Sequence, residues 1–125
     1  MLKEDGTKYE VLLVDDSKLV HIMGKKILTK LGLEVVATAK NGKEGIEKYK
    51  EHHPDLVMMD VTMPVMDGLE ASEKIMEYDM SAEIIMLSAM ADDDIKEQAN
   101  FIGIDYFLQK PLTEEKVKEA LGKIL

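Results

Sequence analysis

Short apolar runs alternate with longer amphipathic stretches along the whole chain. The runs predict strands over residues 10–14, 33–39, 56–60, 83–87 and 106–108. Continuous apolar runs of this length are typical of strands that are buried on both faces of a sheet. Between the runs, apolar residues recur at the spacing of a helix turn, which predicts one helix after each strand.

Cap residues mark the limits of these helices. Ser17, Asn41 and Thr113 are suitable N-caps, and Gly32 and Gly103 are suitable C-terminal stops. The residues that we expect to face the core are Val20, Met23, Ile27 and Leu31 in the first helix, Ile46 and Tyr49 in the second, Leu69, Ser72, Ile75 and Met76 in the third, Ile95, Ala99 and Ile102 in the fourth, and Val117, Ala120, Leu121 and Ile124 in the fifth.

Five strand-then-helix units joined by short connections indicate an α/β protein. They imply a parallel sheet that is covered by helices on both faces through right-handed crossovers. With 125 residues, no internal repeat and no linker, the chain is expected to form one domain over residues 9–125, preceded by an N-terminal tail over residues 1–8.

Composition and charge narrow the range of functions. No apolar run approaches the roughly 20 residues of a spanning helix, and the N-terminus lacks the apolar core of a signal peptide, so a cytoplasmic location is expected. Cysteine is absent, which excludes disulfides and thiolate chemistry. The net charge of −9 argues against direct binding of nucleic acid and is compatible with a divalent cation or a basic partner.

Polar side chains that could take part in a reaction or bind a ligand follow four of the predicted strands. Asp15 and Asp16 follow the first strand, Asp60 ends the third, Ser88 follows the fourth and Lys110 follows the fifth. Ligands bind at the carboxyl ends of the strands in open parallel sheets, so these side chains converge if their strands are neighbours. Carboxylates that crowd together repel one another unless a hard cation such as Mg²⁺ binds them.

This set of side chains suits the transfer of a phosphoryl group to an aspartate. A cation, a lysine and a hydroxyl can hold the phosphoryl oxygens while one carboxylate acts as the nucleophile. Asp60 taken alone could equally cap a turn. The alternatives are a small phosphatase or phosphotransferase of the haloacid dehalogenase type and a flavodoxin-like cofactor binder. The first usually carries its nucleophile after strand one, and the second needs a phosphate loop that is absent after residue 14.

The motifs at the strand ends resemble those of a known family. The chain from about Tyr9 to its C-terminus is similar to response-regulator receiver domains, especially stand-alone CheY-like ones. The motifs that carry the resemblance are Asp15-Asp16, Met59-Asp60, Met63-Pro64, Asp67-Gly68, Ser88-Ala89 and Lys110-Pro111. The resemblance implies a (βα)5 flavodoxin-like three-layer sandwich with a parallel sheet in the order 2-1-3-4-5.

The resemblance also implies a metal site and a phosphoacceptor. Asp60 would accept the phosphoryl group. Asp15 and Asp16 would hold Mg²⁺ (or Mn²⁺), with Asp16 the more direct ligand, and Asp60 and the backbone carbonyl of Thr62 would complete the protein's share of the coordination. Ser88 would donate its hydroxyl to the phosphoryl group. The family further implies that Lys110 pairs with that group and that the Lys110-Pro111 bond is cis.

A switch and a rate-tuning pair follow from the same resemblance. Ser88 would move toward the phosphoryl group, and Phe107 would then swing inward, while strand alternation points Tyr106 the other way. Thr62 and Met90 would flank the phosphoryl group. Neither can act as a general base for water, so a slow self-hydrolysis is expected.

The implied partners are proteins. A sensor histidine kinase would supply the phosphoryl group, and a downstream partner would bind through the fourth helix, the fifth strand and the fifth helix, as in chemotaxis. A monomer is expected, with a phosphorylation-dependent dimer as the alternative. The end of the chain at the fifth helix favours a stand-alone regulator, and a receiver from a longer protein with an effector domain is the alternative.

Three remaining features have plain interpretations. Eight of the ten methionines lie between Met58 and Met90, and we expect most of them to fill the core rather than a partner surface. The three histidines are expected to be solvated. The run 92–94 of three aspartates is expected to begin the fourth helix, with partner selection as the alternative.

Overall fold

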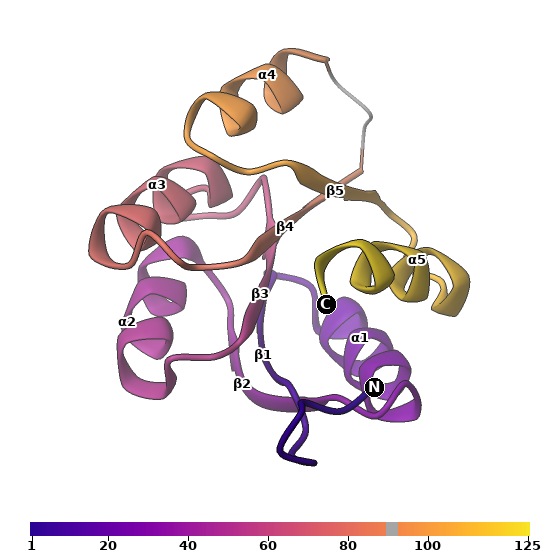
Figure 1. Ribbon diagram of the computed structural model, residues 1–125. Helices are drawn as coiled ribbons and strands as arrows, with labels where there is room; N and C mark the ends of the chain where they lie inside the picture. Colours follow the sequence, from indigo (N-terminus) through magenta and orange to yellow (C-terminus); the bar gives the residue numbers. More distant parts are fainter. Residues whose placement is uncertain (90–92) are drawn as a thin grey trace.

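The computed structural model describes residues 1–89 and 93–125 and has the predicted α/β architecture (Figure 1). The strands are β1 (Glu10–Val14), β2 (Glu34–Ala39), β3 (Leu56–Asp60), β4 (Ile84–Ser88) and β5 (Tyr106–Gln109). The helices are α1 (Lys18–Lys30), α2 (Gly42–His52), α3 (Gly68–Tyr78), α4 (Asp93–Phe101) and α5 (Glu114–Ile124). Each predicted strand and helix is therefore present, with boundary shifts of one or two residues.

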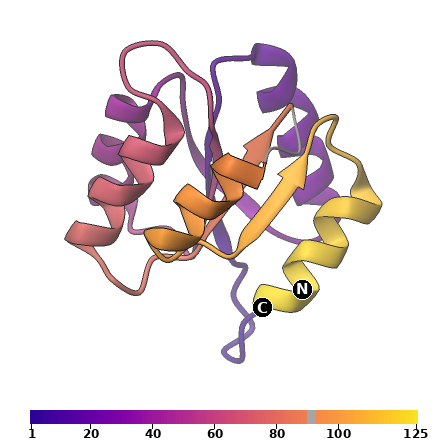
Figure 2. The ribbon, with the colours of Figure 1, turned by 90° about the horizontal axis from the view of Figure 1, so that it is seen from above.

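The five strands form one parallel sheet in the order β2-β1-β3-β4-β5, as the family resemblance implied. Viewed from above, the sheet stands between two helical layers, with α2, α3 and α4 on one side and α1 and α5 on the other (Figure 2). No helix among the described residues is both long enough and apolar enough to cross a membrane.

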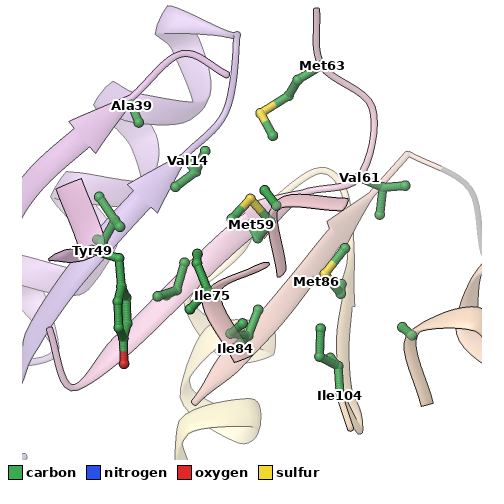
Figure 3. Close-up of a cluster of buried hydrophobic side chains, with 14 residues drawn as sticks. Val14, Ala39, Tyr49, Met59, Val61, Met63, Ile75, Ile84, Met86 and Ile104 are labelled. Carbon is green, nitrogen blue, oxygen red and sulfur yellow. The ribbon is translucent and has the colours of Figure 1, made fainter. Parts of the chain in front are cut away.

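Two apolar clusters fill the spaces between the sheet and its helical layers. In β1, Leu12 and Val14 pack toward α2, α3 and α4, whereas Val11 and Leu13 pack toward α1 and α5. The same alternation runs through β3 and β4, because successive side chains of a strand point to opposite faces. Figure 3 shows the first cluster, in which Met59 and Met86 lie at the centre of the sheet. This burial on both faces explains why the strands read as continuous apolar runs.

Local sequence determines most of the helix ends. Ser17, Asn41 and Thr113 are N-caps, and the side chain of each accepts a hydrogen bond from a backbone N–H in the first helical turn. The stops at Gly32 and Gly103 are also confirmed, since both residues have the positive φ that glycine adopts without strain.

The prediction for the buried face of α1 was partly wrong. Met23 is 38% exposed, and Gly24 and Leu28 are the residues of α1 that are buried. Gly24 lies so close to β1 that an added Cβ would approach Leu13 Cδ2 to 2.8 Å. The face of α1 that contacts the sheet therefore contains a glycine. The prediction followed the spacing of apolar side chains, and glycine has no side chain to count.

The methionine prediction is confirmed for most of the described residues. Met58, Met59, Met63 and Met86 are buried, and Met66 and Met76 pack against the core, whereas Met80 is 87% exposed. The expectation of solvated histidines was wrong for His21, whose Nε2 is buried without a hydrogen-bond partner among the described residues. Asp92, the first residue of the acidic run, lies outside the described residues, and Asp93 begins α4.

Candidate functional site

The register of the sheet brings four of the predicted side chains to one edge. Val14 pairs with Met59 across β1 and β3, so Asp15 and Asp60, which follow them, are neighbours. Asp60 pairs with Leu87 across β3 and β4, and Ser88 pairs with Gln109 across β4 and β5. The side chains therefore follow the strand order along the carboxyl edge of the sheet, and Lys110 is the residue after Gln109.

Lys110 joins the two buried carboxylates. Its Nζ lies 2.7 Å from Asp15 Oδ2 and 3.2 Å from Asp60 Oδ1. Asp15 is fully buried and Asp60 is 5% exposed, whereas Asp16 is exposed. One ammonium group thus faces two carboxylates in a largely dry site, which leaves an excess of negative charge there.

The carboxylate of Asp15 is held rigidly. Its Oδ1 accepts a hydrogen bond of 2.9 Å from the backbone N–H of Ser17, and its backbone N–H donates to the carbonyl of Ala39 at 3.0 Å. Apart from the ion pair with Lys110, the buried Oδ2 has no hydrogen-bond partner among the described residues. A buried carboxylate oxygen with a single neighbour is suited to a further positively charged ligand.

The site shifts the pKa of both Asp60 and Lys110 upward. Burial and the nearby charge of Asp15 raise the pKa of Asp60 to about 6, although Lys110 acts in the opposite direction. Burial on its own would lower the pKa of Lys110, but the hydrogen bond and charge of Asp15, together with Asp60, outweigh it and raise that pKa. At neutral pH, Asp60 is therefore ionised and Lys110 is protonated.

The three carboxylates of this edge fit a divalent cation. Asp15, Asp16 and Asp60 each offer an oxygen, and these oxygens all lie within 4.8 Å of one another. Carboxylate oxygens are the ligands that Mg²⁺ takes in proteins, and that ion keeps several waters besides one or two carboxylates. A cation there would compensate the charge that Lys110 leaves unbalanced.

The loop after β3 is folded tightly against the site, and Gly68 makes this possible. The backbone N–H of Gly68 donates to the carbonyl of Val61 at 2.8 Å. A Cβ on residue 68 would collide with the carbonyl oxygen of Asp60. In the sequence, Asp67-Gly68 is recognisable only as one of the family motifs. The structure adds that residue 68 must lack a side chain for α3 to begin beside Asp60.

The other predicted site residues have clear places, with one exception. Ser88 ends β4 at the same edge, and exposed Thr62 lies in the loop that follows Asp60. Phe107 is half-buried against the cluster beneath α2, α3 and α4, and Tyr106 packs against the opposite cluster, as strand alternation predicted. Met90 lies outside the described residues. The Lys110-Pro111 peptide bond is cis, as expected.

Comparison with known families agrees with this geometry. The model of the response regulator receiver domain family matches residues 11–122, which is most of the chain.

Individual relatives are similar over almost their whole length. The chain is 47% identical over 117 residues to the chemotaxis protein CheY of Bacillus subtilis and covers 98% of that protein with 94% of its own length. It is 43% identical over 125 residues to the chemotaxis protein CheY of Treponema pallidum, of which it covers 87% with 98% of its own length.

A solved structure is similar in both fold and sequence. A chain from the crystal structure of the CheX–CheY–BeF3–Mg²⁺ complex of Borrelia burgdorferi superposes with a TM-score of 0.94 and 35% identity. The match covers 98% of this chain and 94% of that chain.

Proposed function

The chain belongs to the response regulator receiver domain family, and from this premise we propose that Asp60 accepts a phosphoryl group from a histidine kinase. The protein is a signalling protein of the chemotaxis type, whose relatives are CheY proteins. The observation that carries the assignment to Asp60 is the pair of distances from Lys110 Nζ to Asp15 and Asp60 across the carboxyl edge of the sheet. Residues 9–125 act as the receiver unit in this proposal.

The chemical step is a transfer between two nucleophiles. A carboxylate oxygen of Asp60 attacks the phosphorus of a phosphohistidine, so that an O–P bond forms while the N–P bond breaks. The leaving imidazole keeps the electron pair of that bond and takes up a proton. A pKa of about 6 leaves Asp60 ionised at neutral pH, as a nucleophile must be. Hydrolysis reverses the modification when water attacks the same phosphorus.

The neighbouring side chains hold the charge that develops. Lys110 pairs with the phosphoryl group, and the Ser88 hydroxyl donates a hydrogen bond to it. Asp15, Asp16, Asp60 and the carbonyl of Thr62 would hold the metal ion. Mg²⁺, when bound, supplies positive charge that neutralises the phosphoryl oxygens. The fixed carboxylate of Asp15 keeps Lys110 in position by its 2.7 Å ion pair.

The switch transmits the modification to the face made by α4, β5 and α5. Ser88 moves toward the phosphoryl group, and Phe107, which is half-buried, turns further inward. A hollow of about 300 Å³ between β5 and α5, lined in part by Phe107, Lys116 and Lys123, supports this face as the place where a downstream protein binds. The similar chain from Borrelia burgdorferi was solved as a complex with CheX, which is in keeping with a protein partner.

The lifetime of the phosphoryl group depends on Thr62 and Met90 in this proposal. Thr62 is exposed in the loop after Asp60, and Met90 follows Ser88 by two residues. Neither side chain activates water, so the protein catalyses its own dephosphorylation slowly. Replacing Met90 by Asn should speed the decay of phosphorylated protein, and an unchanged decay rate would count against this part of the proposal.

The phosphoryl donor in this proposal is a sensor histidine kinase in the cytoplasm, and the receiver turns over no external substrate. Incubation with simple phosphomonoesters separates this account from a phosphatase, because repeated turnover of such esters would contradict it.

The experiment for the main proposal is phosphoryl incorporation from a small-molecule phosphodonor with Mg²⁺. Intact-mass spectrometry should find one phosphoryl group on the wild-type protein and none on Asp60→Asn. Asp105→Asn is the matched control, because Asp105 is an exposed aspartate beside β5 and away from the carboxyl edge. Incorporation at the wild-type level in Asp60→Asn would refute the proposal.

A further inference from the structure

A groove lined by residues of α3 and α4 lies between these two helices. Both helices are on the side of the sheet away from α1 and α5 (Figure 2). Its volume is about 660 Å³, larger than the hollow beside α5. Residues 67, 70 and 73 form its α3 wall, and residues 94, 97, 98 and 101 form its α4 wall. Each set has the three-to-four-residue spacing of one helix face, so two helical stripes face each other across the groove.

The walls of the groove carry negative charge only. Asp67, Glu70 and Glu73 line it from α3, and Asp94 and Glu97 line it from α4, whereas no lysine is among its lining residues in the described part of the chain. A concave surface with one sign of charge concentrates the field and attracts ligands of the opposite sign.

An aromatic side chain stands at the edge of this acidic groove. Phe101 is 92% exposed, the highest exposure among the large apolar side chains of the described residues. Leu69 and Ile102 also line the groove and pack against the core cluster below it. The groove therefore has an apolar floor and an aromatic rim between carboxylate walls, and exposed apolar surface rimmed by polar groups is typical of a binding site.

We propose that the α3–α4 groove binds a basic amphipathic helix of a partner protein. The apolar face of that helix would pack on Leu69, Ile102 and Phe101, and its lysine and arginine side chains would pair with the carboxylates of the two walls. The 11 residues of α3 span about 16 Å, which fits a helix of about 11 residues. A second copy of this chain is a poor occupant, because its own net charge is −9.

This surface is separate from the one proposed for the phosphorylation-dependent partner. The groove uses the side of α4 that faces α3, whereas the proposed output face uses α4 together with β5 and α5. The groove is present in the unmodified chain, so we expect binding there without a phosphoryl group. The assignment of Asp60 as phosphoacceptor and the binding of a helix in the groove can therefore be refuted separately.

The test uses a synthetic helical peptide of about 11 residues with lysines on one face and leucines on the other. Its binding to the unmodified full chain is followed by the chemical shifts of backbone amides. The shift changes should concentrate in α3 and α4. The double variant Glu70→Lys/Glu97→Lys should weaken binding about tenfold or more, and Phe101→Ala should weaken it by about fivefold.

Matched variants distinguish specific binding of the peptide in the groove from non-specific attraction of a basic peptide to an acidic protein. Glu47→Lys/Glu51→Lys makes the same charge change at two exposed positions of α2, and Met80→Ala removes another exposed apolar side chain. Both should stay within about twofold of the wild type. Equal weakening in Glu47→Lys/Glu51→Lys and the groove variants, or shift changes centred outside α3 and α4, would overturn the proposal. So would self-association of the wild type that Phe101→Ala abolishes, combined with no peptide binding.

Discussion

Lys110 Nζ lies 2.7 Å from Asp15 Oδ2, and no surface of Asp15 is exposed to solvent. The two residues come from opposite ends of the chain, and they meet although β3 and β4 lie between β1 and β5 in the sheet, because the long Lys110 side chain extends along its carboxyl edge. A fully buried carboxylate needs a partner of opposite charge. Lys110 supplies it and reaches Asp60 at 3.2 Å with the same amino group.

Replacing Lys110 by Met should therefore destabilise the protein strongly at neutral pH. Removal of one member of a buried ion pair leaves the other charge uncompensated and typically costs about 3–5 kcal/mol. The measurement is urea denaturation at pH 7.5 without divalent cations. Lys123→Met, on the exposed end of α5, should change the free energy of unfolding by less than about 1 kcal/mol. An equally small change in Lys110→Met would contradict the role of the pair.

The raised pKa of Asp60 should appear as a pH dependence of stability. In the folded state the carboxyl of Asp60 keeps its proton up to pH about 6. In the unfolded state it loses the proton near its ordinary pKa of 3.8. The free energy of unfolding should thus fall as the pH rises from about 4 to about 6 and stay low above that. The difference should be roughly 1–3 kcal/mol.

Asp60→Asn isolates this effect from the titration of other groups. In a chelator, the variant should be more stable than the wild type at pH 7.5, and the difference should shrink as the pH falls to 4. The measurement is the midpoint of urea denaturation at several pH values. Asp105→Asn should follow the wild type throughout. A wild type that loses stability between pH 6 and pH 4 relative to Asp60→Asn would show that the pKa shift has the opposite sign.

Added Mg²⁺ should stabilise the wild-type protein against heat. A cation that binds only the folded state at 100 times its dissociation constant adds about 2.7 kcal/mol. Asp16→Asn should lose most of this gain, because Asp16 offers one of the three clustered oxygens and its exposure leaves the fold intact. Asp105→Asn should keep the full gain. An undiminished gain in Asp16→Asn would place the cation elsewhere.

The close approach of Gly68 to Asp60 can be tested with two alanine substitutions. Gly68→Ala should destabilise the protein by about 2–3 kcal/mol, since its Cβ would collide with the Asp60 carbonyl. Gly122→Ala is the control, because nothing lies within 4 Å of an added Cβ there and alanine favours a helix by about 0.5–1 kcal/mol. Thermal denaturation should thus move in opposite directions for the two variants, and a stable Gly68→Ala would refute the contact.

Much of the fold follows from local patterns in the sequence. The strands are recognisable because Val11, Leu13 and their neighbours are buried on both faces of the sheet. The buried face of α1 was less predictable, because helical spacing does not distinguish the stripe of Met23 from the adjacent stripe of Gly24 and Leu28. That choice depends on how closely the helix approaches Leu13.

The sequence predicted which residues form the site, but not how they are arranged in space. Asp15, Asp60 and Lys110 stand at strand ends, which the apolar runs locate. Their convergence depends on the strand order, and periodicity does not determine that order, so it had to come from the family resemblance. The α3–α4 groove was not foreseen, because it arises from the distance between two helices. Nothing in the pattern around Phe101 specifies that distance.

The central claim is that Asp60 is the phosphoacceptor, and locating the modified residue tests it most directly. The wild-type protein is phosphorylated by a small-molecule donor with Mg²⁺, the acyl phosphate is trapped by reduction, and the modified peptide is sequenced by mass spectrometry. The account predicts that the modification lies at Asp60 alone. A modification at Asp15, Asp16 or a histidine, with Asp60 unmodified, would contradict it.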